Sequence, residues 1–372
     1  MALLLLCGGA IVYTLAVFPL AIWALARWRG RPPKASAAGE PPFVSVIVPV
    51  YNEAGILREK IANCLALDYP ADRVEFLFAL DGCTDGSESV FAGVRDPRVR
   101  WRVFPANRGK AAVLNDVIPE ARGGIVALTD ASGMINPAGL REVAALFADP
   151  EVGGVSGIYQ VRREAGTELD SAEHSYLGLE MKLRYWEGLY RTSLSGTGSL
   201  FAFRQADFQP FPAGLINDDF VLPASLALRG RRIVYAPGAR VSDRLSTSLG
   251  RLFRRRVRIA YGNWQQLGPL RGLLNPARGY LFWVFLSHKL MRTWLPFIVV
   301  LFLASSVAFG AAVFAGVMGA FLLLLLAGAL GLWLDRHFSR WNPLGLLALI
   351  FINFAAVFVG TAKFVAGRRA AW

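Results

Sequence analysis

The sequence predicts an α/β domain with a mainly parallel, Rossmann-like sheet, joined to apolar helices, and three observations lead to this fold class. Short β-branched runs alternate with amphipathic stretches in the middle of the chain, which is typical of parallel strands connected by helices. Long apolar runs lie toward both ends. Hydrophobic residues make up 54% of the chain and charged residues only 18%, against about 25% in ordinary soluble proteins.

Composition also limits the class of protein. The chain has 372 residues and a formal net charge of +13, and its apolar content excludes an intrinsically disordered protein. The three cysteines exclude a disulfide scaffold, show no metal-ligand spacing and suit a reducing compartment. The three histidines do not cluster along the sequence.

The first apolar run covers residues 3–26 and is long enough to cross a bilayer of about 30 Å. No basic residue precedes it, which disfavours a cleaved signal peptide. Basic residues follow it within 27–34, so the positive-inside rule places the N-terminus outside and the following chain in the cytoplasm. We expect residues 1–30 to form an N-terminal transmembrane helix and residues 31–42 to form a linker.

The second apolar zone lies at the other end of the chain. Residues 278–293 mix aromatic with charged side chains, which favours an amphipathic helix at the membrane interface. Residues 294–372 then provide about three transmembrane helices. Their predicted bounds are 294–313, 316–334 and 344–366. One N-terminal span plus three would leave the end outside, whereas Arg368 and Arg369 favour the inside. The sequence leaves this conflict open.

Residues 43–277 are predicted to form the cytosolic α/β domain, because they hold most of the carboxylates and nearly all the turn residues. Its predicted strands lie at 44–50, 74–80, 99–104 and 124–130. Its predicted helices lie at 54–66, 110–120 and 137–148. Ligands of parallel α/β sheets bind beyond the carboxyl ends of the strands, so side chains at those ends are candidates for a functional site.

Polar clusters follow three of these strands. They are Pro49 to Glu53, Asp81 to Ser87 and Thr129 to Ser132. A surface turn would explain any one of them. Three clusters at strand ends of one sheet are expected to converge on a single crevice.

In chain order, the motifs PVYNE, DGCTDGS, NRGK (107–110), TDAS and NDDF (217–220) resemble those of family 2 glycosyltransferases, which have the GT-A fold. The flanking spans and the ending NFAAVFVGTAKFVAGRRAAW resemble the membrane-embedded branch that includes cellulose, poly-N-acetylglucosamine and hyaluronan synthases. The resemblance implies an inverting glycosyltransferase of the cell membrane. It would move a sugar from a nucleotide-sugar, expected to be a UDP-sugar, to a polysaccharide or lipid acceptor at the cytoplasmic face. It also implies Mg²⁺ or Mn²⁺ as cofactor and allows a partner membrane subunit.

The resemblance assigns nucleotide contacts to the first two clusters. The carboxylate of Asp81 would accept the uracil N3–H, although Leu80 replaces the first acid of the usual acidic pair. Pro49, Tyr51 and Glu53 would line the same pocket. For Glu53, an acid favoured by the helix dipole at a helix start is the alternative.

Asp130-Ala131-Ser132 occupies the place of the family's Asp-x-Asp metal motif. The resemblance implies that Asp130 and Ser132 contact a divalent cation and the leaving diphosphate. One carboxylate together with phosphate oxygens is an acceptable Mg²⁺ site. Lys110 would contact the nucleotide, with a solvated surface lysine as the equal alternative.

Asp218 and Asp219 begin a predicted helix and match the end of the family's Thr-Glu-Asp pattern. The resemblance makes Asp219 the catalytic base that takes the acceptor's proton, with Asp218 as its partner. Adjacent carboxylates raise the pKa of one member, which helps base chemistry near neutral pH. An acid pair that caps a helix start is the alternative.

The loop from Ser195 to Ser199 is similar to a glycine loop that the family places near the acceptor, which implies acceptor-side roles for Gly196, Thr197 and Gly198. A phosphate-binding loop is the competing interpretation. It is disfavoured because the lysine that opens the helix of a P-loop is absent.

The basic run at 251–258 lies where processive members carry Gln-x-x-Arg-Trp, which places Arg255 at the Gln and Arg258 at the Arg. Arginine forks suit a diphosphate leaving group. The lost Gln and Trp favour one or few transfers. An amphipathic helix on anionic lipid headgroups explains the run equally well, whereas spans on both sides disfavour nucleic acid as a partner.

Other classes of protein remain open. A catalytically inactive membrane scaffold with the same domain would account for the incomplete metal motif. A nucleotidyl- or phosphoryltransferase would use a similar crevice. A transporter is disfavoured, because the predicted spans lack buried charged residues at mid-depth.

Overall fold

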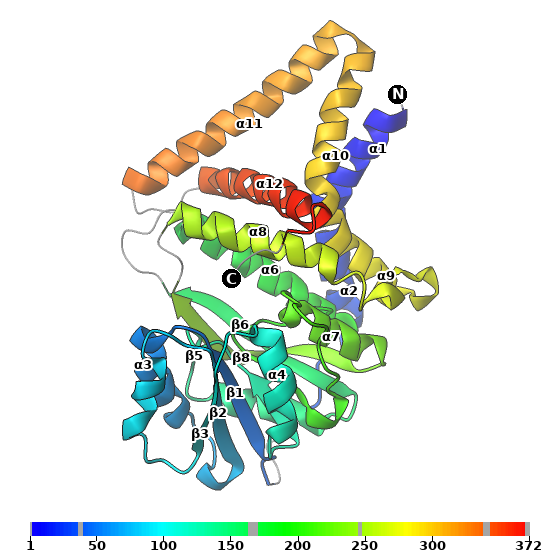
Figure 1. Ribbon diagram of the computed structural model, residues 1–372. Coiled ribbons are helices and arrows are strands. Elements are labelled where there is room, and N and C mark those ends of the chain that lie inside the picture. Colours follow the sequence, from blue (N-terminus) through cyan, green and yellow to red (C-terminus); the bar gives the residue numbers. More distant parts are fainter. Residues whose placement is uncertain (1, 36–39, 163–169, 245–247, 338–342, 369–372) are drawn as a thin grey trace. The chain divides into compact units, whose positions relative to one another are not determined.

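The computed structural model describes residues 2–35, 40–162, 170–244, 248–337 and 343–368 (Figure 1). The chain divides into two compact units. The sheet unit consists of Arg29–Arg162 and Arg184–Arg244, and the helical unit of Met1–Trp28, Arg163–Leu183 and Leu245–Trp372. One helix, α6 (Asp170–Tyr190), begins in the helical unit and ends in the sheet unit.

The described part of the sheet unit contains one eight-stranded sheet in the order β3-β2-β1-β4-β7-β6-β8-β5. Its strands are β1 Val44–Val50, β2 Val74–Asp81, β3 Val99–Phe104, β4 Ile125–Leu128, β5 Met134–Ile135, β6 Val152–Arg162, β7 Phe201–Arg204 and β8 Arg232–Arg244. The pairs β1–β2, β2–β3, β1–β4 and β6–β8 are parallel. The pairs β4–β7, β6–β7 and β5–β8 are antiparallel. The predicted α/β class is therefore confirmed, with a parallel half and a mixed half.

The helices of the sheet unit follow the predicted strands. They are α3 Ala54–Leu65, α4 Lys110–Val117, α5 Gly139–Ala145 and α7 Asp218–Leu228. Short 3₁₀ segments are Ala71–Arg73, Ser87–Gly93, Ile118–Glu120, Leu146–Ala148 and Gln205–Asp207. The predicted helix 110–120 thus ends as an α-helix at Val117 and continues as a 3₁₀ turn.

The core fixes where the strands end. Strand β2 is buried at every residue, and Phe76 and Phe78 belong to the same buried cluster as Val46 and Val48 of β1. Burial of each such side chain contributes about 1.5–3 kcal/mol. Strand β2 is one residue longer than predicted and ends with Asp81, so this carboxylate is anchored by the core rather than carried on a loop.

The described residues of the helical unit are mostly helical. Its α-helices are α1 Ala2–Val12, α2 Phe18–Arg29, α8 Leu249–Gln265, α9 Tyr280–Val284, α10 Met291–Ser306, α11 Ala311–His337 and α12 Pro343–Val365. Its π-helical stretches are Tyr13–Val17 and Phe285–Leu290. Its 3₁₀ segments are Arg271–Leu274, Pro276–Arg278 and Val307–Phe309.

In the described residues, four helical stretches are long and apolar enough to cross a membrane, by length and composition. They are Ala2–Arg29, Tyr280–Phe309, Ala311–Leu334 and Leu344–Val365. Residues 278–293, predicted as a separate interfacial helix, are in the structure mostly the first part of the continuous stretch Tyr280–Phe309. A π-helical turn carries the helix through their charged residues. Helix α8, predicted within 43–277, belongs to the helical unit.

Candidate active site

Asp81 joins the second polar cluster to the segment NRGK. Its carboxylate accepts the backbone N–H groups of Arg108, at 2.7 Å, and Gly109, at 2.8 Å, and the residue is 3% exposed. Gly82 has φ +63°, and a Cβ there would lie 2.2 Å from the backbone nitrogen of Asn107. Only glycine has no Cβ and adopts this conformation at no steric cost, so the two loops are packed backbone against backbone.

Lys110 lies at the centre of the site. Its Nζ contacts Asp130 Oδ1 at 2.9 Å and Asp218 Oδ2 at 3.0 Å. Burial lowers the pKa of Lys110, but attraction to the two carboxylates outweighs burial and raises that pKa above its ordinary value. The alternative of a solvated surface lysine is wrong, because the side chain is only 16% exposed and bridges two acids.

Asp218 and Asp219 open α7 and differ in their surroundings. Asp218 is buried, and burial raises its pKa, with the neighbouring charge of Asp219 adding and that of Lys110 opposing. Asp219 is exposed. The pair therefore presents one carboxylate that is held by Lys110 and one that faces solvent.

The glycine loop lies against Asp219 and Asp130. The backbone N–H of Gly196 donates to the carbonyl oxygen of Asp219 at 2.9 Å. A Cβ on Gly198 would lie 3.0 Å from Asp130 Oδ2. The Thr197 hydroxyl turns inward and donates to the Leu200 carbonyl at 3.0 Å, so this loop offers its backbone and its glycines to a ligand.

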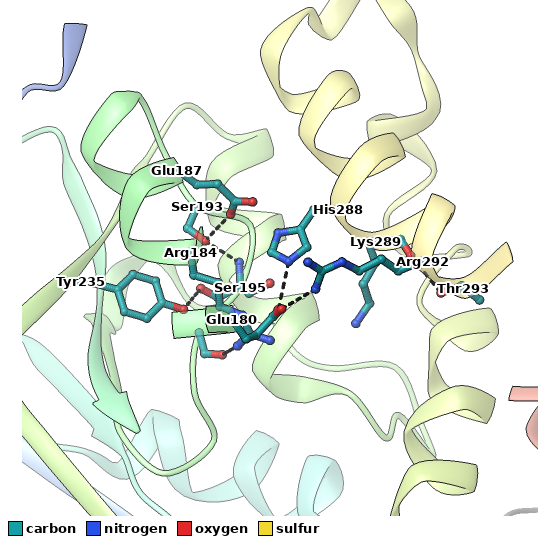
Figure 2. Close-up of polar contacts among 11 residues, drawn as sticks. Glu180, Arg184, Glu187, Ser193, Ser195, Tyr235, His288, Lys289, Arg292 and Thr293 are labelled. Carbon is teal, nitrogen blue, oxygen red and sulfur yellow. Dashed lines mark hydrogen bonds and ion pairs between the residues drawn. The ribbon is translucent and has the colours of Figure 1, made fainter. Parts of the chain in front are cut away.

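The loop is also held from behind. Arg184 of α6 donates to the carbonyl oxygen of Gly196 at 3.0 Å, and the hydroxyl of Tyr235 in β8 donates to the carbonyl oxygen of Ser195 at 2.9 Å. Figure 2 shows these side chains together with Glu187, whose carboxylate accepts the hydroxyl of Ser193. The loop conformation is thus fixed by polar side chains of α6 and β8.

The first polar cluster is tied to the second. The backbone N–H of Glu53 donates to Ser87 Oγ at 3.1 Å, and that of Ala54 donates to Asp85 at 2.9 Å. Burial raises the pKa of Glu53, with further increases from the charges of Asp243, Asp130 and Asp85. The Glu53 side chain makes no capping hydrogen bond to α3. It therefore shares the electrostatic field of the candidate site.

The remaining predicted residues lie in different settings. Pro49 is paired within the sheet, opposite Ala79, and Tyr51 is exposed beyond the end of β1. Ser132 is partly exposed in the turn after Asp130. Arg255 and Arg258 lie on α8 of the helical unit. Their predicted contact with the donor stays a prediction.

The site also contains a lysine that the sequence argument missed. Lys60 of α3 is fully buried, and its Nζ donates to Thr129 Oγ1 at 2.9 Å and to the carbonyl oxygen of Gly133. Burial lowers its pKa. The signal was in the pattern, because Lys60 shares a helical face with the apolar Leu57 and Cys64.

The residues fit a divalent cation that arrives with a diphosphate. The described residues include no group of three or more His, Cys, Asp or Glu side chains that could hold a metal. Asp130 is 37% exposed and gives one oxygen to Lys110. Mg²⁺ is commonly held by one or two carboxylates plus substrate phosphates. Asp130 therefore suits a cation that is bound jointly by the protein and the substrate, and not one bound by protein ligands alone.

Lys110 thus bridges Asp130, which follows β4, and Asp218, which opens α7, and the glycine loop lies beside them on an α/β sheet. Residues 41–262 match the family model described as glycosyltransferase like family 2, and the chain belongs to that family.

Curated relatives cover part of the chain. The beta-monoglucosyldiacylglycerol synthase of Nostoc sp. (strain PCC 7120) is 31% identical over 177 residues, 45% of this chain and 37% of that protein. The poly-beta-1,6-N-acetyl-D-glucosamine synthase of Staphylococcus aureus (strain MSSA476) is 27% identical over 230 residues, 60% and 55% of the two chains. The match thus spans about a third to a half of these relatives' length.

A solved structure is similar over the whole chain. It is a mannosyltransferase from Pyrobaculum calidifontis in complex with GDP-Man and Mn²⁺, with a TM-score of 0.74 and 23% sequence identity, covering 99% of this chain and 100% of that one. This likeness confirms the GT-A fold.

Proposed function

We propose that this protein is a membrane-bound, inverting glycosyltransferase that moves a sugar from a nucleotide-sugar to a lipid or polysaccharide acceptor. The observation that carries the proposal is the bridge from Lys110 to Asp130 and Asp218, with Asp219 exposed beside it. The bridge joins Asp130, the predicted metal ligand, to Asp218 of the predicted catalytic pair. Membership of glycosyltransferase like family 2 supports the reaction class.

The donor lies, in this proposal, over the ends of β1, β2 and β4. Asp81 orders the NRGK segment through two backbone hydrogen bonds, and its carboxylate retains acceptor capacity for a base N–H. Pro49, Tyr51 and Glu53 line the nucleoside side. We expect a UDP-sugar. Because the similar mannosyltransferase structure contains GDP-mannose, a GDP-sugar is the donor to compare with a UDP-sugar.

Asp219 acts as the base. Its exposed carboxylate takes the proton of an acceptor hydroxyl, that oxygen attacks the anomeric carbon, and the nucleoside diphosphate leaves from the opposite face. One displacement inverts the configuration at that carbon. A positioned base of this kind contributes about 10²–10⁴ in rate.

Lys110 stabilises the leaving group. Its ammonium group contacts Asp130. The positive charge of Lys110 therefore lies close to the diphosphate and stabilises the negative charge that develops there. Asp130, with Ser132, would hold Mg²⁺ or Mn²⁺. A bound divalent cation supplies additional positive charge to the diphosphate oxygens.

The acceptor and the membrane are proposed together. The loop of Gly196, Thr197 and Gly198 borders Asp219 and Asp130, so it lies where an acceptor hydroxyl must arrive. The apolar stretches of the helical unit suit a lipid-borne acceptor. We expect the cell membrane as the location, with the sheet unit at its cytoplasmic face, and a partner membrane subunit is compatible with this arrangement.

The test is release of nucleoside diphosphate by the detergent-purified protein, across UDP- and GDP-sugars with Mg²⁺ or Mn²⁺. We expect metal-dependent release from one donor. Asp219→Asn should bind nucleotide as the wild type does and lose at least about 100-fold in turnover, whereas Asp130→Asn should lose metal-dependent binding. Asp72→Asn, at a surface carboxylate, is the matched control.

Other outcomes would contradict the proposal. Pyrophosphate release would indicate a nucleotidyltransferase. Absence of both nucleotide binding and release would indicate an inactive scaffold. Full activity of both Asn variants would show that the residues are assigned wrongly.

A further inference from the structure

Helix α8 lies alongside α12 within the helical unit (Figure 1). Near the start of both helices, Leu252 shares a buried cluster with Leu349. Toward their ends, the indole N–H of Trp264 donates to Thr361 Oγ1 at 2.8 Å. The two helices therefore run side by side over most of their length.

The two backbones also approach closely at Gly360, toward the end of α12. A Cβ on Gly360 of α12 would lie 2.8 Å from the carbonyl oxygen of Val257 and 2.9 Å from the backbone nitrogen of Tyr261. Only the small Cβ of Ala260, at 2.7 Å, is nearer to that position, so the two backbones are in close contact here. Because α8 touches α12 at Leu349 and again at Gly360 and Thr361, near the two ends of α12, the two helices lie at the same depth in any membrane that holds them.

Helix α8 is not suited to hydrocarbon. Five arginines lie within residues 251–258, and Arg251, Arg254 and Arg255 are exposed. An arginine at the centre of a bilayer costs at least about 2.5–3.5 kcal/mol on insertion scales, so several on one helix keep it among the headgroups. The phosphate groups of lipids are the natural partners of such a helix.

Helix α12 has the composition of a span but a different environment on each side. Ala348, Leu349 and Gly360 are buried against other helices, whereas Ile350 and Phe358 are exposed. Helix α8 covers one face of α12 and shields it from water, so that face needs no polar residues. The other face suits the hydrocarbon just below the headgroups. Apolar composition is therefore expected for α12 whether or not it crosses.

The contact with α10 marks the depth of the pair. Phe358 of α12 lies 4.8 Å from Phe297, and Trp264 of α8 lies 5.5 Å from Trp294, measured between ring centroids. The helix carries His288, Lys289 and Arg292 just before Trp294, and residues 295–304 that follow Trp294 have only apolar side chains. Tryptophan at such a boundary is typical of a membrane–water interface.

We propose that α12 lies in the plane of the membrane interface beside α8 and does not cross the bilayer. The chain then crosses in Ala2–Arg29, Tyr280–Phe309 and Ala311–Leu334. The last two crossings return the chain to the side of the sheet unit. Lys363 and Arg368 consequently lie on that side, as the positive-inside rule requires, and the conflict over the number of spans is removed.

Depth measurement tests the proposal directly. Nitroxide labels would be placed at Ala355→Cys in the middle of α12 and at Leu323→Cys in α11, in a variant without the native cysteines, reconstituted in liposomes. Both positions are exposed. We expect the α12 label to lie at interface depth and the α11 label deep in the hydrocarbon. An α12 label as deep as the α11 label would overturn the proposal, because the middle of a crossing helix lies at the bilayer centre.

The side of the membrane gives a second readout. A membrane-impermeant maleimide would be applied to sealed inverted vesicles that hold the full chain with Ala366→Cys or with the partly exposed Cys83 of the sheet unit. We expect both sites to be labelled from the same side. Labelling from opposite sides would show four crossings. Neither measurement depends on sugar transfer, so failure of the proposed function leaves this inference testable.

Discussion

The ammonium group of Lys60 holds both ends of the turn that carries Asp130. It donates to Thr129 Oγ1 before that residue and to the Gly133 carbonyl after it. The Thr129 hydroxyl donates in turn to the carbonyl oxygen of Ser199, the last residue of the glycine loop, at 2.6 Å. One buried side chain thus determines the position of two candidate site elements.

Replacing Lys60 with methionine should separate fold from function. Lys60→Met fills nearly the same space and removes an ammonium charge whose burial is itself unfavourable. The Asp130 turn loses its anchor, and loss of a hydrogen bond from a charged donor costs about 1.5–3 kcal/mol. We expect metal-dependent nucleotide affinity to fall at least about tenfold, measured by titration calorimetry. Arg58→Met, exposed on the same helix, should change nothing. Wild-type affinity in Lys60→Met would show that the turn holds itself.

Tyr235 is expected to make the stability of the protein fall at alkaline pH. Burial raises the pKa of its phenol from 10.0 to about 12. The folded state therefore keeps a proton that the unfolded state loses, and stability falls as pH rises from about 10 to about 12, by about 2–3 kcal/mol. We expect the midpoint of thermal unfolding in detergent to fall over this range. Tyr235→Phe should flatten that fall. A slope unchanged by the variant would assign the loss to other groups.

Among the elements, the joint between β2 and α4 depends on one glycine. Gly82→Ala would put a Cβ 2.2 Å from the backbone of Asn107. Gly214 also has a positive φ, of +69°, but nothing lies within 4 Å of its added Cβ. Gly214→Ala should cost only the left-handed penalty of about 1–2 kcal/mol. Gly82→Ala should cost clearly more and weaken nucleotide binding. Equal unfolding midpoints for the two variants would mean that the loops are not in contact.

The sheet was predictable where local pattern and environment agree. Strand β1 has its predicted bounds because an apolar β-branched run marks a buried parallel strand. Strand β3, at the edge of the sheet, also has its predicted bounds, although its residues are only partly buried. Predicted strand 124–130 is shorter, since the chain turns after Leu128. Strand β8 was not predicted, because its sequence is rich in arginine and its partner β6 lies far away along the chain.

For the candidate site, the sequence indicates candidate residues but not the contacts between them. Asp81 and Asp130 were found because strand ends converge at one edge of a parallel sheet. The bridge from Lys110 to Asp218 joins residues more than a hundred positions apart in the chain. Such a pair depends on how α4 and α7 pack around the end of β4, and no local sequence pattern encodes that packing.

For the molecule as a whole, the helical unit depends on ions buried between its helices. Glu180 of α6 accepts a hydrogen bond from Arg292 and contacts His288 Nε2 at 3.0 Å (Figure 2). Breaking a buried pair by removing one partner costs about 3–5 kcal/mol, whereas replacing both with neutral groups costs less. Glu180→Gln should therefore lower the unfolding midpoint in detergent, and Glu180→Gln with Arg292→Met should recover part of it. Glu120→Gln, which removes an exposed pair with Arg102 worth at most about 1 kcal/mol, is the control. If the double variant were less stable than Glu180→Gln, the arginine would contribute through its packing and not through its charge.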